Sequence, residues 1–507
     1  MKRRRGVAAA MAIGLLLAGC GTRLSQQAIR SAAQVVTSSS GSGGSGAAAS
    51  APSVASSGTS GSGGGGASGS APSVAPSGVS GSGGSGTSGS VASSGPSGSG
   101  GSGTSGSVGS SGPSGSGGSG ASGSVGSSGP SQAPGGGTVP GGCPTGEAPV
   151  MLGNVGNYDG ILAPIFAGAL TSLQAWVKWT NAHGGLNCHP VSLVSADDGG
   201  DPSTNITETE QMVEQDHVIA FVGDMVPLDG NASLSYLESV HVPVIGGDAS
   251  SSYWYDSPVL FPEGSEVQVS TDGAARESAH EGHTKVAVFY CLEDPFCEAY
   301  YESLQSDATS DGVQVVYAGE VSLVQPSFTA ECLAAQQAGA TSVFEVLDGS
   351  SDARAAQDCS VQGFNPLYFT ISIGVTPAIQ QVPQLNGLLL GANDFPWIDN
   401  YTPAQQEFHQ ALAQYDPGAA SSIVGSSASA WASGELVVAA SKYLGTQPTS
   451  SQLFEGLWSI KGDTLGGLAP PLTFTENGYP SIGKCYWVMK LQNGNWIDVD
   501  HGQAVCE

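Results

Sequence analysis

Eight cysteines are spread over residues 143–507 of this 507-residue chain, and their types and spacing limit the chemistry they can do. They are Cys143, Cys188, Cys291, Cys297, Cys332, Cys359, Cys485 and Cys506. Their order suggests the disulfide pairs 143–188, 291–297, 332–359 and 485–506, because each pair would join neighbouring elements. Zinc binding is the alternative that we do not favour, since no two of them have CxxC spacing. We expect no metal site.

Catalytic patterns are lacking in the same region. His280-Glu281-Gly282-His283 differs from the HExxH zinc motif, because its histidines are three residues apart, and Gly282-His283 is typical of a helix exit. Outside the Gly/Ser-rich stretch there is no GxSxG elbow and no phosphate-binding GxxxxGK[ST] loop. We therefore expect no enzyme activity and no cofactor.

The N-terminus carries an export signal. Basic residues 2–5 precede an apolar run, 7–18, which is too short to span a membrane and is typical of a secretory signal. Leu17-Ala18-Gly19-Cys20 resembles the bacterial lipoprotein box, which implies cleavage after residue 19 and lipid on Cys20. The alternative is an ordinary signal with a chance cysteine. Lipidation would anchor the protein to the membrane outside the cytoplasm, where disulfides form.

Residues 20–142 have the composition of a flexible spacer. No Asp, Glu, Lys or Arg occurs between Arg30 and Glu147, and a Gly/Ser-rich unit of 17 residues at 81–97 recurs at 98–114 and 115–131. So little apolar surface cannot offset the entropy of ordering, so we expect a disordered linker. At roughly 5–6 Å times the square root of length, about 106 residues of such a chain would reach about 55–60 Å. A glycosylated or wall-threading stalk is the alternative.

Charge is concentrated in residues 143–507. This part holds all 42 acidic residues and only 8 of the 14 basic ones, a net charge of −34. Nucleic acid and anionic membrane surfaces are therefore poor partners.

Strands and helices alternate from residue 149 onward. Apolar runs predict strands at 149–155, 190–196, 218–223, 242–247, 285–290, 313–319, 342–347, 366–372 and 387–392. Between the first two, residues 163–182 have helical spacing, with Phe166, Ala169, Leu170, Leu173, Trp176 and Val177 on one stripe, and we interpret Trp176 as core. Asn493-Gly494 predicts the turn of a late hairpin. The pattern predicts an α/β fold with parallel sheets flanked by helices, and its length predicts two lobes.

Three pieces of the first half resemble type I periplasmic binding proteins of the branched-chain amino acid (Leu/Ile/Val) type. They are Asn181-Ala182-His183-Gly184-Gly185 before a strand, Asp197-Asp198 with Asp201-Pro202 after it, and Val222-Gly223 leading to VPVIGGDASS. The resemblance, over about 150–505, implies two lobes joined by three chain crossings near 266–272, 392–396 and 468–480. Lobe one would comprise 148–268 and 394–470, lobe two 270–392 and 478–507, and the ligand would lie in the cleft between them.

The resemblance also implies where a ligand would be held, in loops at the ends of strands. The candidate residues are Tyr158, Asp224, Met225, Pro227, Asp248, Ala249, Ser250, Phe296, Asp348 and Ser372. Pro227 replaces a serine common in amino-acid-binding relatives, whereas Ser250 keeps a hydroxyl. Asp224 and Asp248 would favour a cationic or hydroxyl-rich ligand, or they hold turns and helix ends instead. We expect Asp197, Asp198 and Asp201 to cap the following helix.

The implied function is that of a lipid-anchored solute receptor that delivers a small polar solute, an amino acid or related compound, to an ABC permease. Such a receptor would act as a monomer. Two alternatives remain open: a surface sensor of the same fold that signals to a membrane partner, and a structural surface protein with a degenerate cleft.

Overall fold

The computed structural model describes Cys143, 146–481 and 483–506, which belong to one compact unit of the chain. The signal 1–19, the lipidation site Cys20 and the linker 20–142 lie outside the described residues.

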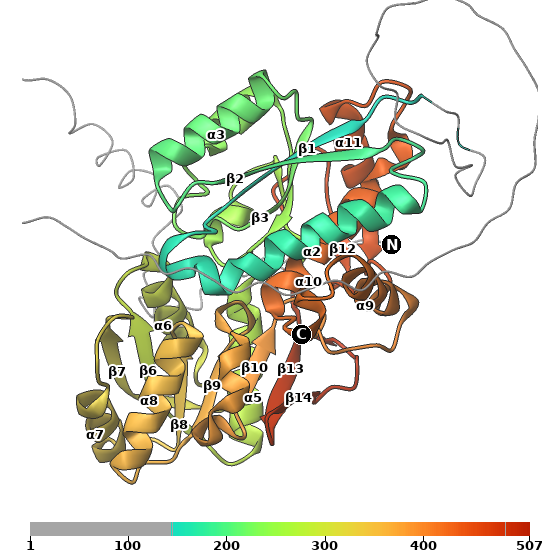
Figure 1. Cartoon of the computed structure of the whole chain (residues 1–507). Helices are drawn as coiled ribbons and strands as arrows, with labels where there is room; N and C mark the ends of the chain where they lie inside the picture. The colour runs from blue at the N-terminus through green and yellow to red at the C-terminus, as the bar shows by residue number, and fades with distance from the viewer. Residues whose placement is uncertain (1–142, 144–145, 482, 507) are drawn as a thin grey trace, which may run out of the picture. The chain divides into compact units, whose positions relative to one another are not determined.

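The first sheet has five parallel strands in the order β2-β1-β3-β4-β5 (Figure 1). They are β1 (Val150–Gly156), β2 (Val191–Asp197), β3 (Ala220–Asp224), β4 (Val244–Gly247) and β5 (Leu260–Phe261). Every residue of β3 and β4 is buried, as expected for parallel strands covered on both faces. The first four strands confirm the sequence prediction, whereas the two-residue β5 was not predicted.

Two helices far apart in the sequence pack together on this sheet. They are α2 (Ala163–Ala182) and α10 (Gly425–Ala440), and α10 also packs on β3 and β4 (Figure 1). The Trp176 ring lies against Gly434 of α10, where an added Cβ would come within 2.5 Å of the ring. Its Nε1 donates to Glu435 Oε1 at 3.2 Å. Trp176 is therefore a core residue, as predicted.

The other elements around the first sheet are α3 (Pro202–Glu214), α4 (Leu234–Val240), α9 (Pro403–Tyr415), α11 (Ser450–Trp458), β11 (Lys461–Asp463) and β12 (Leu472–Thr473). Helices α9 and α11 both begin with a capping box, at Thr402 with Gln405 and at Thr449 with Gln452. In each box the Thr hydroxyl accepts from the Gln N–H, and the Gln side chain accepts from the Thr N–H. The first sheet and these packed elements form the first lobe.

The second sheet combines parallel and antiparallel strands in the order β14-β13-β10-β9-β8-β6-β7. They are β6 (Lys285–Cys291), β7 (Gln314–Val321), β8 (Ser342–Val346), β9 (Leu367–Ile371), β10 (Leu389–Ala392), β13 (Cys485–Gln492) and β14 (Asn495–Asp498), and the short β15 (Val505–Cys506) pairs with β13. Strands β6 to β10 are parallel and were predicted. Strand β13 runs antiparallel to β10, so this sheet is mixed rather than purely parallel.

The turn between β13 and β14 is the one that the sequence predicted. Asn493 and Gly494 connect the strands, and both have positive φ, 53° and 77°. Two successive positive φ values characterise the two-residue turn whose twist matches a hairpin, and Asn-Gly tolerates them best.

Four helices cover the second sheet and complete the second lobe: α5 (Val267–His280), α6 (Pro295–Asp307), α7 (Thr329–Gln337) and α8 (Gly349–Val361). Helix α5 packs on β9, β10 and β13, and α6 packs on β6 and β7 (Figure 1). The chain passes between the lobes after β5, after β10 and after β12. Each lobe is therefore built from two separate stretches of chain.

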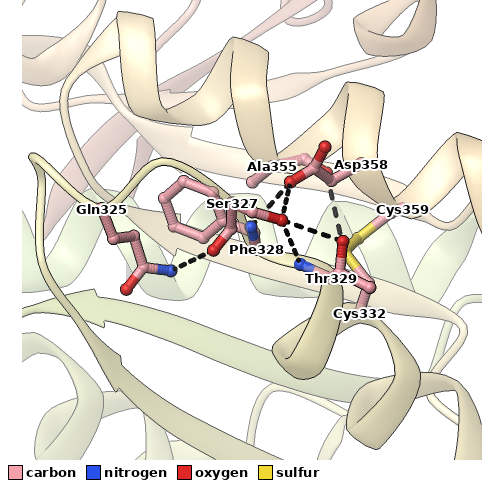
Figure 2. Close-up of a disulfide and its surroundings, with 8 residues drawn as sticks. All are labelled: Gln325, Ser327, Phe328, Thr329, Cys332, Ala355, Asp358 and Cys359. Carbon is pink, nitrogen blue, oxygen red and sulfur yellow. Dashed lines mark hydrogen bonds between the residues drawn. A yellow bond between two sulfur atoms is a disulfide. The ribbon is translucent and has the colours of Figure 1, made fainter.

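Four disulfides join the cysteines in the pairing that their order suggested: Cys143–Cys188, Cys291–Cys297, Cys332–Cys359 and Cys485–Cys506. Figure 2 shows the third, which fastens α7 to α8. Beside it, Asp358 Oδ2 accepts hydrogen bonds from Ser327 Oγ (2.8 Å) and from the Phe328 N–H (2.7 Å). The loop before α7 is thus bonded to α8 next to the covalent link.

None of the helices in the described part of the chain is both long and apolar enough to cross a membrane.

Candidate ligand-binding site

A cavity lies between the two lobes. The first lobe contributes Leu162, Ile165, Phe166, Pro227, Leu228 and Ser250. The second lobe contributes the apolar side chains of Phe296, Leu323, Val346, Leu347 and Ile371, the Cys291–Cys297 disulfide, Gly374, and three acids, Glu293, Asp294 and Asp348. A neighbouring hollow shares Pro227, Leu228, Ser250, Asp294 and Phe296 with it. The walls are chiefly apolar.

The cavity lies where the topology of parallel sheets places ligands. Its second-lobe residues include the last residues of β6, β8 and β9, namely Cys291, Val346 and Ile371. Loops that follow such strand ends converge, so side chains from distant parts of the sequence meet there. From the first lobe, the opening turn of α2 supplies Ile165 and Phe166.

Four of the ten residues predicted to contact ligand line the cavity: Pro227, Ser250, Phe296 and Asp348. The other six are absent from the walls of the cavity and of the neighbouring hollow: Tyr158, Asp224, Met225, Asp248, Ala249 and Ser372.

Asp224 and Asp248 bond to the backbone of their own lobe. Asp224 Oδ1 accepts from the Val155 N–H at 3.0 Å. Asp248 Oδ2 accepts from the Val226 N–H at 2.9 Å, and its Oδ1 accepts from Ser250 and from Trp254 Nε1. Burial raises the pKa of both carboxyls. Their contacts therefore fit the second role that the sequence left open, in which the two carboxylates hold turns.

The remaining four lie in the framework around the cavity. The Tyr158 hydroxyl donates to Asn154 Oδ1 at 2.8 Å, and burial raises the pKa of this phenol. The backbone of Met225 bonds to that of Val155 and Asn157. Ala249 is fully buried with φ 45°, and Ser372 Oγ donates to Asn393 Oδ1 at 3.2 Å.

Two of the lining residues have their polar groups occupied. The Ser250 N–H and hydroxyl both donate to Asp248 Oδ1, at 2.9 and 2.6 Å, so the hydroxyl expected to serve the ligand is engaged. Asp348 caps α8, accepting at Oδ1 from the N–H groups of Ser350 and Ser351 and at Oδ2 from the Ser351 hydroxyl.

Glu293 and Asp294 are the lining acids that sequence reasoning missed. Asp294 caps α6 by accepting from the Phe296 N–H at 3.0 Å through Oδ1, and burial, helped by the charge of Asp248, raises its pKa to about 6. Glu293 Oε1 accepts from Ser322 Oγ and from the Leu323 N–H. The second oxygen of each, Asp294 Oδ2 and Glu293 Oε2, is buried without a hydrogen-bond partner among the described residues. The sequence signal that could have identified Asp294 is the Asp294-Pro295 pair, which is typical of the start of a helix.

The three acids at the end of β2 and in the loop after it have different roles. Asp201 caps α3, as predicted, because its Oδ1 accepts from the Thr204 N–H at 2.8 Å. Asp197 instead accepts from the Tyr158 N–H, and Asp198 accepts from Asn157 and Asn205, so neither caps the helix. Both tie neighbouring loops together.

The histidine pair does not converge on a common site. Helix α5 ends at His280, Gly282 has φ 91°, and the segment is the helix exit that we predicted. His280 Nδ1 lies 3.3 Å from Glu277, whereas His283 Nδ1 lies 2.9 Å from the Thr341 carbonyl oxygen. Within the described residues, no group of three or more His, Cys, Asp or Glu could hold a metal ion.

Two α/β lobes linked by three crossings, with a cavity between them at strand ends, define a two-lobed binding protein. The sequence matches the periplasmic binding protein family over residues 149–495, and the chain belongs to this family. No curated protein has a significantly similar sequence.

Solved structures share the fold at low sequence identity. A fatty acid ABC transporter substrate-binding protein from Thermomonospora curvata is 16% identical, with TM-score 0.61, covering 73% of this chain and 95% of that one. A possible leucine/isoleucine/valine-binding protein from Rhodopirellula baltica is also 16% identical, with TM-score 0.61, covering 71% and 98%. An ABC transporter solute-binding protein from R. palustris in complex with 4-hydroxybenzoate is 17% identical, with TM-score 0.59, covering 69% and 95%.

Proposed function

We propose that this protein is the extracytoplasmic solute receptor of an ABC-type importer, anchored through lipid on Cys20 and a flexible linker. The observation that carries the proposal is the cavity between the lobes, whose walls come from both. A ligand there would hold the lobes together, as hinged binding proteins require. The similar structures named for fatty acid and 4-hydroxybenzoate binding support a small-molecule ligand.

The apolar walls do not match the small polar solute that the sequence favoured. An amino acid needs groups that pair its ammonium and carboxylate, and the expected Ser250 hydroxyl is bonded to Asp248. An apolar wall instead favours a ligand with a hydrophobic body, because burying that surface is favourable.

A thermal-shift screen of the oxidised full chain against small organic molecules tests this function. A ligand that binds only the folded protein raises the melting temperature once its concentration exceeds its Kd. We expect a shift for at least one class with an apolar body. Silence across amino acids, sugars, acids, amines and alcohols, with folding verified, would contradict a receptor role.

A further inference from the structure

The charged side chains in the walls of the cavity are all acidic. The charged side chains that line it are Glu293, Asp294 and Asp348, and its walls contain no Lys, Arg or His among the described residues. Arg354 of α8 is outside the walls, and it donates to the Leu323 carbonyl oxygen and to the Ser350 and Ser351 hydroxyls. An anion in this cavity would therefore meet carboxylates with no cationic side chain in the walls to pair it.

Two acceptor oxygens in these walls lack a donor within the part of the chain that the structure describes. Asp294 is 7% exposed; its Oδ1 is used by the helix cap, and its Oδ2 is buried without a partner among those residues. Glu293 Oε2, on the preceding residue, is likewise buried and has no partner among them. A buried carboxylate oxygen without a hydrogen bond is costly, and a donor on a ligand would remove that cost.

The segment that carries these acids is fixed in place. The Cys291–Cys297 disulfide spans it and joins the end of β6 to the first turn of α6. Glu293 is held by Ser322 and Leu323 from the loop after β7, and Asp294 by the Phe296 N–H. The two free oxygens are thus presented by a rigid loop, which favours a defined ligand geometry.

We propose that the ligand is an apolar amine without a carboxylate, whose protonated nitrogen donates to Asp294 Oδ2 while its hydrocarbon part contacts the walls. The proposal rests on the receptor function proposed above and names its ligand class. A charge-assisted hydrogen bond of this kind is stronger than a neutral one and suits a single buried carboxylate. Two of the similar structures are named with acids, fatty acid and 4-hydroxybenzoate, so the preference proposed for this chain is opposite in charge.

The test compares molecules of one shape that differ only in charge. Benzylamine, benzyl alcohol and benzoate, and then hexylamine, hexanol and hexanoate, are titrated calorimetrically into the oxidised full chain at neutral pH. We expect the amine of each series to bind at least tenfold more tightly than the alcohol, and the carboxylate to bind least.

Asp294→Asn tests the contact itself. Asparagine keeps an oxygen for the Phe296 N–H, so the cap of α6 can persist while the charge is lost. The amines should lose at least tenfold in affinity, whereas the alcohols should change less than threefold. Glu210→Gln, on the exposed face of α3, removes one charge far from the cavity walls and should change neither.

Each outcome has a distinct meaning. Tighter binding of carboxylates than of amines would overturn the amine proposal and leave the receptor function standing. The same holds if amines bind but Asp294→Asn leaves their affinity unchanged. If Asp294→Asn fails to fold, the affinities of the wild-type protein for the amine, alcohol and carboxylate of each series still test the amine proposal. If neither these probes nor the broader screen finds a ligand, both proposals fail.

Discussion

The Tyr300 hydroxyl of the second lobe donates a hydrogen bond to the main-chain oxygen of Ser250 in the first lobe, over 3.3 Å. Tyr300 is fully buried, and Ser250 belongs to the cavity wall. The bond therefore bridges the lobes next to the proposed ligand site, and it exists only while the lobes are together.

Tyr300→Phe should weaken both stability and ligand binding. Losing one buried hydrogen bond should lower the free energy of unfolding by about 1 kcal/mol, measured by urea denaturation. Because the bond favours the closed arrangement, ligand affinity should fall up to about fivefold. Tyr301→Phe is the control, since its ring stacks on Tyr290 with centroids 5.1 Å apart. Equal effects of the two variants would contradict the bridging role.

Leu228→Lys should reverse the charge preference of the cavity. Leu228 lines the cavity yet is 37% exposed, so a lysine can keep its stem there and its ammonium solvated. We expect benzylamine to bind at least tenfold more weakly than to the wild type and benzoate to bind more tightly, measured by calorimetry. Leu228→Met should retain the wild-type order, and a lysine variant with the wild-type order would contradict the electrostatic argument.

Removing the disulfide Cys291–Cys297 should damage binding more than stability. It closes a segment of only 6 residues, so the chain-entropy model gives about 2 kcal/mol for its loss. It also fixes the loop that presents Asp294. The double Ser variant should therefore bind the amine at least fivefold more weakly.

The Cys332–Cys359 disulfide is the matched control. It spans 27 residues, for which the same model gives about 3.5 kcal/mol, and neither cysteine lines the cavity. Its double Ser variant should lose more stability in urea and keep its ligand affinity. If calorimetry shows a larger loss of ligand affinity for this variant than for the Cys291–Cys297 variant, the shorter disulfide does not position the site.

Stability should decrease as the pH rises from 4 to 7. Asp229 and Asp394 are each 1% exposed, and burial raises the pKa of each carboxyl to about 7. The folded state then holds protons that the unfolded state, with ordinary pKa values, has released, so this stabilisation is complete below pH 4 and lost through pH 7. A carboxyl whose pKa is higher by one in the folded state than in the unfolded state adds about 1.4 kcal/mol to the free energy of unfolding at low pH.

Melting temperatures at constant ionic strength check this direction. Asp394→Asn removes one of the titrating groups while its partner, the Ser429 hydroxyl, can still bond to the amide. The melting temperature of the variant should decrease less between pH 4 and 7 than that of the wild type. A wild-type melting temperature that rises over this interval would contradict the assignment of raised pKa values.

Cys20→Ser should release the protein from the membrane. If lipid on this residue is the anchor, the wild type should partition into the detergent phase and incorporate labelled palmitate, and the variant should do neither. Glu210→Gln, which keeps Cys20 and all four disulfides, is the control. If the Cys20 variant still partitions into the detergent phase, the proposal of a lipid anchor on Cys20 is contradicted, whereas the prediction of a secretory signal is unaffected.

Short sequence patterns predicted most strands of the fold, because the residues within each strand and turn largely determine its local structure. The nine predicted strands were apolar runs between turn residues, and Asn493-Gly494 specified its turn through the φ values it tolerates. The site was predicted less completely. Asp224 ends β3 and Asp248 directly follows β4, but whether a carboxylate faces a cavity or its own backbone depends on the packing of the loop.

Phe166 shows the complementary difficulty. It was counted in the core stripe of α2, and it is both buried and part of the cavity wall. An apolar binding site uses the same residue types and the same helical period as a core, so no sequence pattern separates the two. Asp294 was overlooked for a similar reason, because helix capping already explains an Asp before Pro295.

The chain cannot be divided into its lobes by a single cut. Strand β13 is the partner of β10 in the second sheet, yet the 92 residues between them include α9, α10 and α11 of the first lobe. A piece ending after β10 would leave that strand's edge unpaired and the first lobe without α10. Dissection should therefore give pieces that recover structure only when mixed, and heating the intact protein should melt both lobes in one transition.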